Sequence, residues 1–210
     1  MPTYYSYVIT RDYGFAPNPF GRECTLATCK PQIRKFAVVG DWVFGTTSVA
    51  GNRSPKLVFA MEVTGKTDFN SYYSDPIYQY KKPVMNGSLK KMYGDNIYHS
   101  SITQDGAIQW LQDDSHHSLK DGTTNIYNLE RDTNNSDSVL VSDHFYYLGK
   151  EAMDIPSGMV NAFCKKGPAY RTVDELDAQR IIRILTCRYS KGFVADPAQF
   201  RGTFKRYNGK

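Results

Sequence analysis

The sequence has no run of about eighteen apolar residues, the length that a membrane-spanning helix needs. Its opening stretch, MPTYYSYVIT, lacks the charged start and apolar segment of a secretion signal. The four cysteines, at positions 24, 29, 164 and 187, are too unevenly spaced for a secreted disulfide framework. These absences argue against membrane-spanning and disulfide-stapled classes, and we expect a cytoplasmic protein with reduced thiols.

Common enzyme signatures are also missing. There is no G-x-x-x-x-G-K-[ST] phosphate loop, no G-x-G-x-x-G, no G-x-S-x-G elbow and no H-E-x-x-H pair. Structural zinc sites usually have closely spaced ligand pairs on both sides, but twenty-two residues separate Cys164 from Cys187. We therefore expect no metal and no cofactor, with the cysteines acting first as small buried hydrophobes.

What the sequence does have is aromatic residues, which make up 14% of its 210 residues and include sixteen tyrosines. A tyrosine combines a flat apolar face with a polar tip, so it suits both sheet surfaces and stacking sites. The net charge of +5 is unevenly placed: residues 1–101 carry twelve Lys/Arg against seven Asp/Glu, 102–150 three against eight, and 151–210 eleven against six. A basic–acidic–basic chain can present a positive face to a polyanion.

The order of apolar runs predicts a sheet-rich first half and a late helix. Strands are expected at 5–10 and 56–65, a strand–turn–strand over 34–48, a short strand at 94–99, and a strand with its continuation at 138–149. A short helix could fit within 24–35. The one long helix is expected near 173–187, with Thr172 and Glu175 as a capping box.

These elements favour an α+β domain built around a curved sheet or β-barrel with peripheral helices. We expect one domain over residues 1–210, with its core mainly in 1–100 and a polar insertion around 102–137.

The segment DYGFAPNPFGRECTLATCKP (12–31) is too rich in proline to be helical and too apolar for a flexible linker. Such a stiff aromatic loop is typical of a segment that walls a binding site. Its end carries two possible nucleophiles, Cys24 and Cys29, and Lys30 next to the second one would lower a thiol pKa.

Histidines offer a second source of chemistry. His116 and His117 lie beside carboxylates in DDSHHS, so either one could act as an acid–base group, with Asp113 or Asp132 as its orienting carboxylate. If the pair lies in a strand, the two rings point to opposite faces and only one reaches a shared site.

The stretch GFAPNPFGRECTLATCKPQIRKFAVVGDWVFG resembles the nucleotide modification associated domain 2 family of bacteria and their viruses. The resemblance continues through YYSDPIYQYKKP, GDNIYH, SDHFYYLG and DIP, and so covers most of the chain. It implies a role beside systems that make or process modified nucleotides, often in phage-related or defence settings, and it carries no established catalytic mechanism.

A looser similarity in layout links the chain to PUA-like barrels, including EVE, ASCH and YTH-like readers, which hold a single base in a cleft. On that reading Phe15, Phe20 and Trp42 offer stacking faces and Asn18 pairs with a base edge. The basic side chains Lys30, Arg34 and Lys35 would then meet flanking phosphates. The alternative for each aromatic is core packing.

Three functions therefore stay open. The first is recognition of a modified base in nucleic acid or as a nucleotide, and the second is an enzyme acting on such a base. The third is an adaptor that contacts partner proteins of a modification or anti-phage system through the acidic middle, 102–150.

Overall fold

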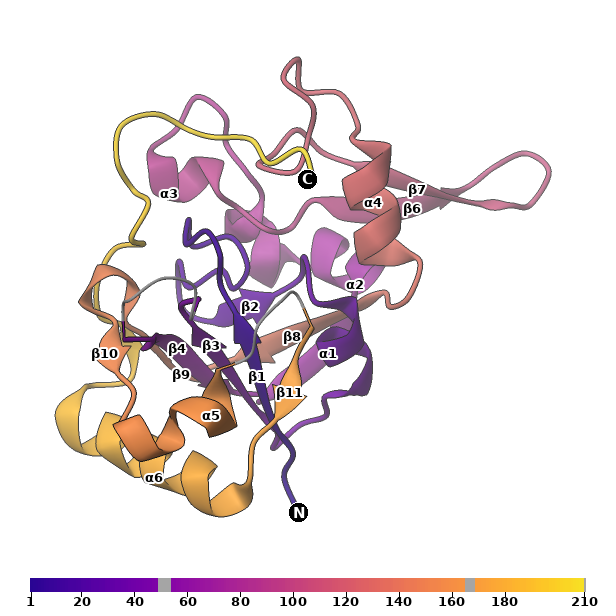
Figure 1. Ribbon diagram of the computed structural model, residues 1–210. Helices are drawn as coiled ribbons and strands as arrows, with labels where there is room; N and C mark the ends of the chain where they lie inside the picture. Colours follow the sequence, from indigo (N-terminus) through magenta and orange to yellow (C-terminus); the bar gives the residue numbers. More distant parts are fainter. Residues whose placement is uncertain (49–53, 165–168, 210) are drawn as a thin grey trace.

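The computed structural model describes residues 1–48, 54–164 and 169–209, which form three sheets with mostly short helices around them (Figure 1). The helices are α1 (Pro31–Phe36), α2 (Phe69–Ser74), α3 (Leu89–Met92), α4 (Ile126–Thr133), α5 (Val160–Phe163) and α6 (Glu175–Arg188). Three 3-10 segments cover Pro76–Lys81, Gly149–Glu151 and Ser157–Met159.

The main sheet has seven strands in the order β11–β1–β3–β4–β9–β12, with β10 paired to the start of β4. The strands are β1 (Tyr4–Val8), β3 (Trp42–Thr46), β4 (Lys56–Glu62), β9 (His144–Tyr147), β10 (Met153–Asp154), β11 (Arg171–Thr172) and β12 (Gly192–Phe193). β1 runs parallel to β3, because the chain between them leaves the sheet to form β2 and α1.

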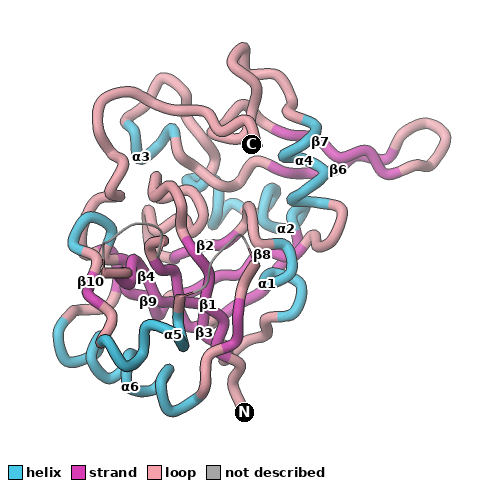
Figure 2. Tube along the Cα trace, in the orientation of Figure 1, coloured by secondary structure: helices cyan, strands magenta, loops and turns pink. Residues whose placement is uncertain are grey.

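Two smaller sheets complete the fold. β2 (Cys24–Leu26), β8 (Ser138–Ser142) and β5 (Gly65–Asp68) form an antiparallel sheet in the order β2–β8–β5. β6 (Tyr98–Ile102) and β7 (Ile108–Gln112) form a hairpin that projects from the body (Figures 1 and 2).

Alternation along the strands divides the core into layers. Tyr4, Trp42 and Phe44 face the cluster that contains α5 and α6, whereas Tyr5 and Tyr7 face the cluster shared with β2, β8 and α1. A third cluster joins the far side of that small sheet to α2, α4 and β6. The twenty-residue proline-rich segment contributes to both the second and the third cluster, and Cys29 near its end is half-buried.

The expected mixture of helices and strands is confirmed, and the sheets in the described part of the chain are open rather than closed into a barrel. The long helix begins at Glu175, where Asp174 accepts from the Leu176 N–H and caps it. The capping box with Thr172 was wrong, because Thr172 lies in β11 opposite Tyr5.

The expected strand–turn–strand over 34–48 was wrong in its first half. Residues 34–36 belong to α1, which Pro31 opens with its fixed φ, and only the second half forms a strand, β3. Within the described residues, no helix combines the length and the apolar character that crossing a membrane would require.

Candidate active site

Cys29 lies in a tight turn between β2 and α1. Cys29 and Lys30 both adopt left-handed backbone conformations, with φ of 57° and 42°, which are uncommon outside glycine. The Cys29 N–H donates to Asp132 Oδ1 at 2.9 Å, and Arg34 Nε donates to the Cys29 carbonyl at 2.9 Å. The turn is thus held from both sides, as expected where strained backbone positions a functional group.

His117 lies in the polar turn that follows β7. Its carbonyl accepts hydrogen bonds from Asn128 Nδ2 at 2.8 Å and from Gln112 Nε2 at 3.3 Å. Two anchors from different elements therefore fix its backbone, and its buried side chain has little freedom to turn away.

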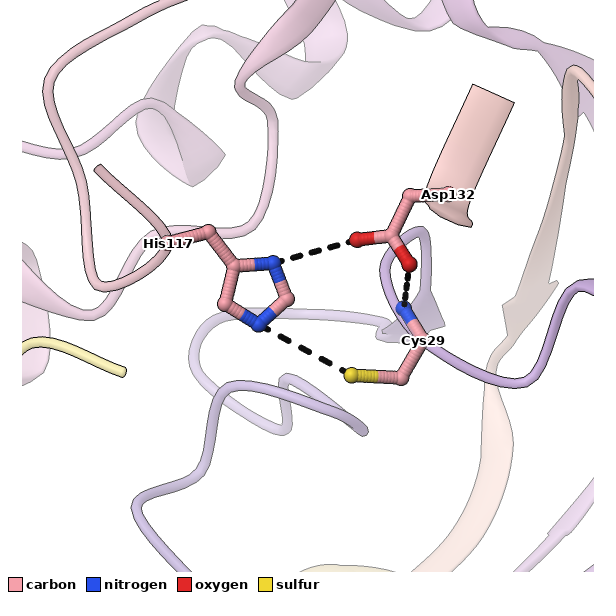
Figure 3. Close-up of side chains that lie close together, drawn as sticks. All are labelled: Cys29, His117 and Asp132. Atoms are coloured by element: carbon pink, nitrogen blue, oxygen red, sulfur yellow. Dashed lines mark hydrogen bonds and ion pairs between the residues drawn. The ribbon is translucent and has the colours of Figure 1, made fainter. Parts of the chain in front are cut away.

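Asp132 completes a chain of three side chains from three distant segments (Figure 3). The imidazole of His117 lies between the other two groups, with Nε2 3.8 Å from Cys29 Sγ and Nδ1 3.1 Å from Asp132 Oδ2. An Nδ1–H that donates to the carboxylate leaves Nε2 to exchange a proton with the thiol. This is the order of nucleophile, base and orienting acid used in nucleophilic catalysis.

Arg131 adds positive charge to this group. Its Nε and Nη2 donate to the two oxygens of Asp132, each at 2.9 Å, and Nη2 lies 3.8 Å from Cys29 Sγ. Tyr98 also donates to Asp132 Oδ2 at 2.9 Å. The carboxylate is fully engaged, so it is held both ionised and oriented.

The pKa shifts in this group favour the charged forms. Burial alone would raise the pKa of Cys29, but His117 and then Arg131 lower it to below its ordinary value. Burial alone would lower the pKa of His117, yet Cys29 and Asp132 raise it. Burial opposes ionisation of Asp132 as well, and His117 and Arg131 hold its pKa well below the ordinary value. The shifts of Cys29 and His117 are both in the direction of a thiolate–imidazolium pair.

The thiol lines a cavity of about 710 Å³, which lies within the range of small-molecule sites. Aromatic side chains form much of its wall: Tyr7, Phe15, Tyr170 and Tyr207. Cationic side chains are present too: Arg11, Lys30 and Arg131. A flat, anionic compound suits such a lining, because rings stack on aromatic faces and phosphates pair with cations.

The same three donor atoms lie within 4.8 Å of one another, a spacing that a metal ion also permits. However, Cys29 lies beside Nε2 of His117 and Asp132 lies beside Nδ1. An ion bound to one of these nitrogens is therefore not placed to be ligated by both Cys29 and Asp132. Arg131 also occupies both oxygens of Asp132 and would repel a cation. The arrangement fits proton exchange better than metal binding.

The two histidines do not lie in a strand, and the expectation that they point to opposite faces was wrong. They occupy a turn, and their rings are roughly parallel, with centroids 5.7 Å apart. His116 donates from Nδ1 to the Lys205 carbonyl at 2.5 Å, and burial, followed by the charge of His117, lowers its pKa to about 3. His116 therefore lines the cavity as a neutral ring.

The remaining catalytic candidates lie outside the triad. Cys24 is fully buried in β2, and burial raises its pKa to about 12. Asp113 accepts a hydrogen bond from Tyr73 at 3.0 Å. Of the two cysteines and the two carboxylates that the sequence offered, the structure brings together only Cys29 and Asp132.

Of the four predicted base-binding residues, the structure places only Phe15 at the cavity, with its ring edge-on to His117 at 4.6 Å. Trp42 is buried in the cluster beneath α6, and Phe20 packs on Phe193 and Phe200. These placements match the core-packing alternative.

Asn18 is buried with every polar group of its side chain engaged. Nδ2 donates to the Tyr93 carbonyl at 2.8 Å, while Oδ1 accepts from Lys81 at 2.9 Å and from the Phe20 N–H at 3.3 Å. At 1% exposure it lies outside the lining of the cavity, so its amide does not face a base there.

The three predicted phosphate-binding residues also lie in different environments. Lys30 lines the cavity, and Lys35 is exposed on α1 beside Phe36. Arg34 is completely buried, where it donates to main-chain carbonyls that include those of Ser136 and Ser138. Its contacts join the Cys29 turn to the end of α4, so it positions the site.

Sequence reasoning missed several contributors, namely Arg11, Arg131, Tyr7, Tyr98, Tyr170 and Tyr207. For Arg131 a signal existed, because it stands next to Asp132 in a segment with few cations. The tyrosines carried no distinguishing pattern among sixteen.

The family described as nucleotide modification associated domain 2 matches residues 1–204 of this chain. Because the match covers nearly the whole sequence, the chain belongs to that family. No curated protein and no solved structure matched it.

Proposed function

We propose that this family member is a cysteine-dependent enzyme that acts on a nucleotide or a modified base, beside a nucleotide-modification or anti-phage system. The observation that carries the proposal is the Cys29–His117–Asp132 chain at the wall of an aromatic, cationic cavity. The family description supports the substrate class, and the geometry supports the type of chemistry.

The reaction that suits this arrangement is transfer or hydrolysis at a carbonyl-type carbon carried by the base. Cys29 Sγ forms a bond to that carbon, and the bond to the leaving nitrogen or oxygen breaks with its electron pair. The leaving atom takes the Nε2 proton of His117. Water, which gives a proton to Nε2, then cleaves the thioester and restores the thiol.

A second candidate is recognition of a modified base without chemistry, in the manner of PUA-like readers. The aromatic lining of the cavity favours it, because stacking contributes about 1–3 kcal/mol per base. An adaptor role through the acidic stretch 102–150 has less support, since His117 and Arg131 of this stretch line the cavity and Asp132 holds His117 from behind.

Substitution of Cys29 by serine separates the two candidates. Wild type and Cys29→Ser would be incubated with nucleotides and short oligonucleotides carrying base modifications, and products followed by mass spectrometry. We expect turnover by wild type and a loss of about 10³-fold or more in the variant, because the nucleophile is removed. Cys187→Ser is the matched control, since Cys187 is an exposed thiol on α6.

Ligand-induced thermal stabilisation that persists in Cys29→Ser, together with turnover only in wild type, supports the enzyme. Binding without product in either protein would favour the reader.

A further inference from the structure

A second, smaller cavity of about 290 Å³ adjoins the one described above. Ile9, Thr10 and Ser48 line both cavities, so the chain just after β1 forms their common wall. The two cavities therefore lie next to each other along residues 9 and 10.

Cationic side chains line the second cavity as well. Lys56 and Lys150 are both exposed there. Lys56 forms an ion pair with Asp154, with Nζ 3.3 Å from Oδ1. Lys150 makes no ion pair within the described part of the chain. Its ammonium is thus available to an anion from outside.

Gln199 contributes a neutral donor to the same space. Its Oε1 accepts from the Asp12 N–H at 2.5 Å, which fixes the amide orientation and leaves its Nε2–H₂ as a donor at the cavity.

The one carboxylate in this cavity is largely satisfied from within. Asp12 accepts from Tyr147, from the Ala198 N–H at 2.9 Å and from the Gly14 N–H at 3.4 Å. Burial raises its pKa, although these hydrogen bonds act in the opposite direction.

We propose that the two cavities form one groove for single-stranded nucleic acid, in which the reacting base enters the larger cavity and the adjoining phosphate and nucleotide occupy the smaller one. The inference rests on the proposed function for the identity of the reacting base, and it names the substrate as a polymer rather than a free nucleotide. Cations spaced along a groove with aromatic walls are the usual design for single strands.

Fluorescence anisotropy with a labelled oligothymidylate octamer tests the groove. Thymidine 5′-monophosphate serves as competitor, and the titrations are repeated over a range of salt concentrations. We expect the octamer to bind at least about ten times more tightly than the mononucleotide, because it also occupies the second cavity.

The variant is Lys150→Glu, and its matched control is Arg183→Glu, the same charge change at an exposed site on α6. Lys150→Glu should weaken octamer binding about tenfold and reduce the slope of log affinity against log salt by about 0.7, the value for one lost phosphate contact on a single strand. Mononucleotide binding should not change. Arg183→Glu should stay within twofold of wild type.

Equal affinity for octamer and mononucleotide, no octamer binding at low salt, or equal effects of the two charge reversals would overturn the groove. Failure of the proposed function looks different. In that case Cys29→Ser and wild type bind the octamer alike, and neither forms a product from any modified oligonucleotide.

Discussion

Two largely buried polar clusters each include residues of the proline-rich segment, and they respond to burial in opposite ways. The triad cluster consists of Cys29, His117, Arg131 and Asp132, and the lysine cluster consists of Asn18, Thr25, Tyr72, Lys81 and Asp95. In the lysine cluster, Lys81 donates to Asn18 and to the Glu23 carbonyl, and Asp95 accepts from Thr25 and Tyr72.

In the lysine cluster burial prevails. It lowers the pKa of Lys81 and raises the pKa of Asp95, so both groups shift toward neutrality. In the triad cluster the contacts between opposite charges prevail, and the pKa of Cys29 falls while that of His117 rises. Burial is common to both clusters, so the contacts between opposite charges are what reverse the direction of the shifts in the triad cluster.

The largest effect that tests this difference is expected from His117→Gln compared with His116→Gln. Loss of His117 removes the positive charge that lowers the thiol pKa, so the pH at which Cys29 is alkylated should rise, and turnover should fall about 10³-fold or more. His116 is neutral, so its variant should leave the alkylation midpoint close to that of wild type. Mass-resolved iodoacetamide labelling across pH measures both, and equal midpoint shifts in the two variants would contradict the assignment.

A stability effect is expected from the other cluster. Lys81→Met removes a buried donor to Asn18 and to the Glu23 carbonyl, and should lower the free energy of unfolding by about 3–5 kcal/mol because each acceptor left unpaired costs about 1–3 kcal/mol. Tyr72→Phe, a milder change at the same cluster, should cost about 1–3 kcal/mol because one donor to Asp95 is lost. Urea unfolding measures both.

The alkylation profile of Cys29 should be unchanged in both lysine-cluster variants. A shift of that profile in folded Tyr72→Phe would show that the two clusters act as one network.

A further effect concerns acid stability. The pKa of His116 is about 3 in the folded protein and near 6.5 when unfolded. Between those values the unfolded chain binds the extra proton, so His116 makes the free energy of unfolding decrease as pH falls from about 6.5 toward 3. His116→Phe should flatten this part of the pH–stability curve, which thermal unfolding at fixed salt would reveal. An unchanged slope would mean that His116 is protonated in the fold.

Local patterns were enough to predict several elements of the fold. The strands at 56–65 and 138–149 correspond to β4 and to β8 with β9, because long apolar runs bounded by turn residues leave few alternatives. The short helix expected within 24–35 corresponds to α1, but its last residues, 34–36, were assigned to a strand because RKFAVV has the apolar content of one. Pro31 and the left-handed turn before it initiate a helix there instead.

The site was predictable only as a set of alternatives. Residue type and the adjacent residues in the sequence pointed to three pairs of candidates: Cys24 or Cys29, His116 or His117, and Asp113 or Asp132. No sequence pattern favoured one member of any pair over the other. The choice depends on contacts between residues far apart in the sequence. Cys29 and His117 are separated by 88 positions, and Cys29 and Asp132 by 103. The aromatic candidates failed to converge for the same reason, because Trp42 and Phe15 face different layers.

The pH dependence of Cys29 alkylation in the wild-type protein tests the central claim most directly. Exposed Cys187 is an internal reference in the same sample. The account predicts that Cys29 reacts with iodoacetamide with a half-maximal pH clearly below that of Cys187, because His117 and Arg131 stabilise its thiolate. A midpoint for Cys29 at or above that of Cys187 would mean that burial prevails at this thiol, and the account of the triad cluster would be wrong.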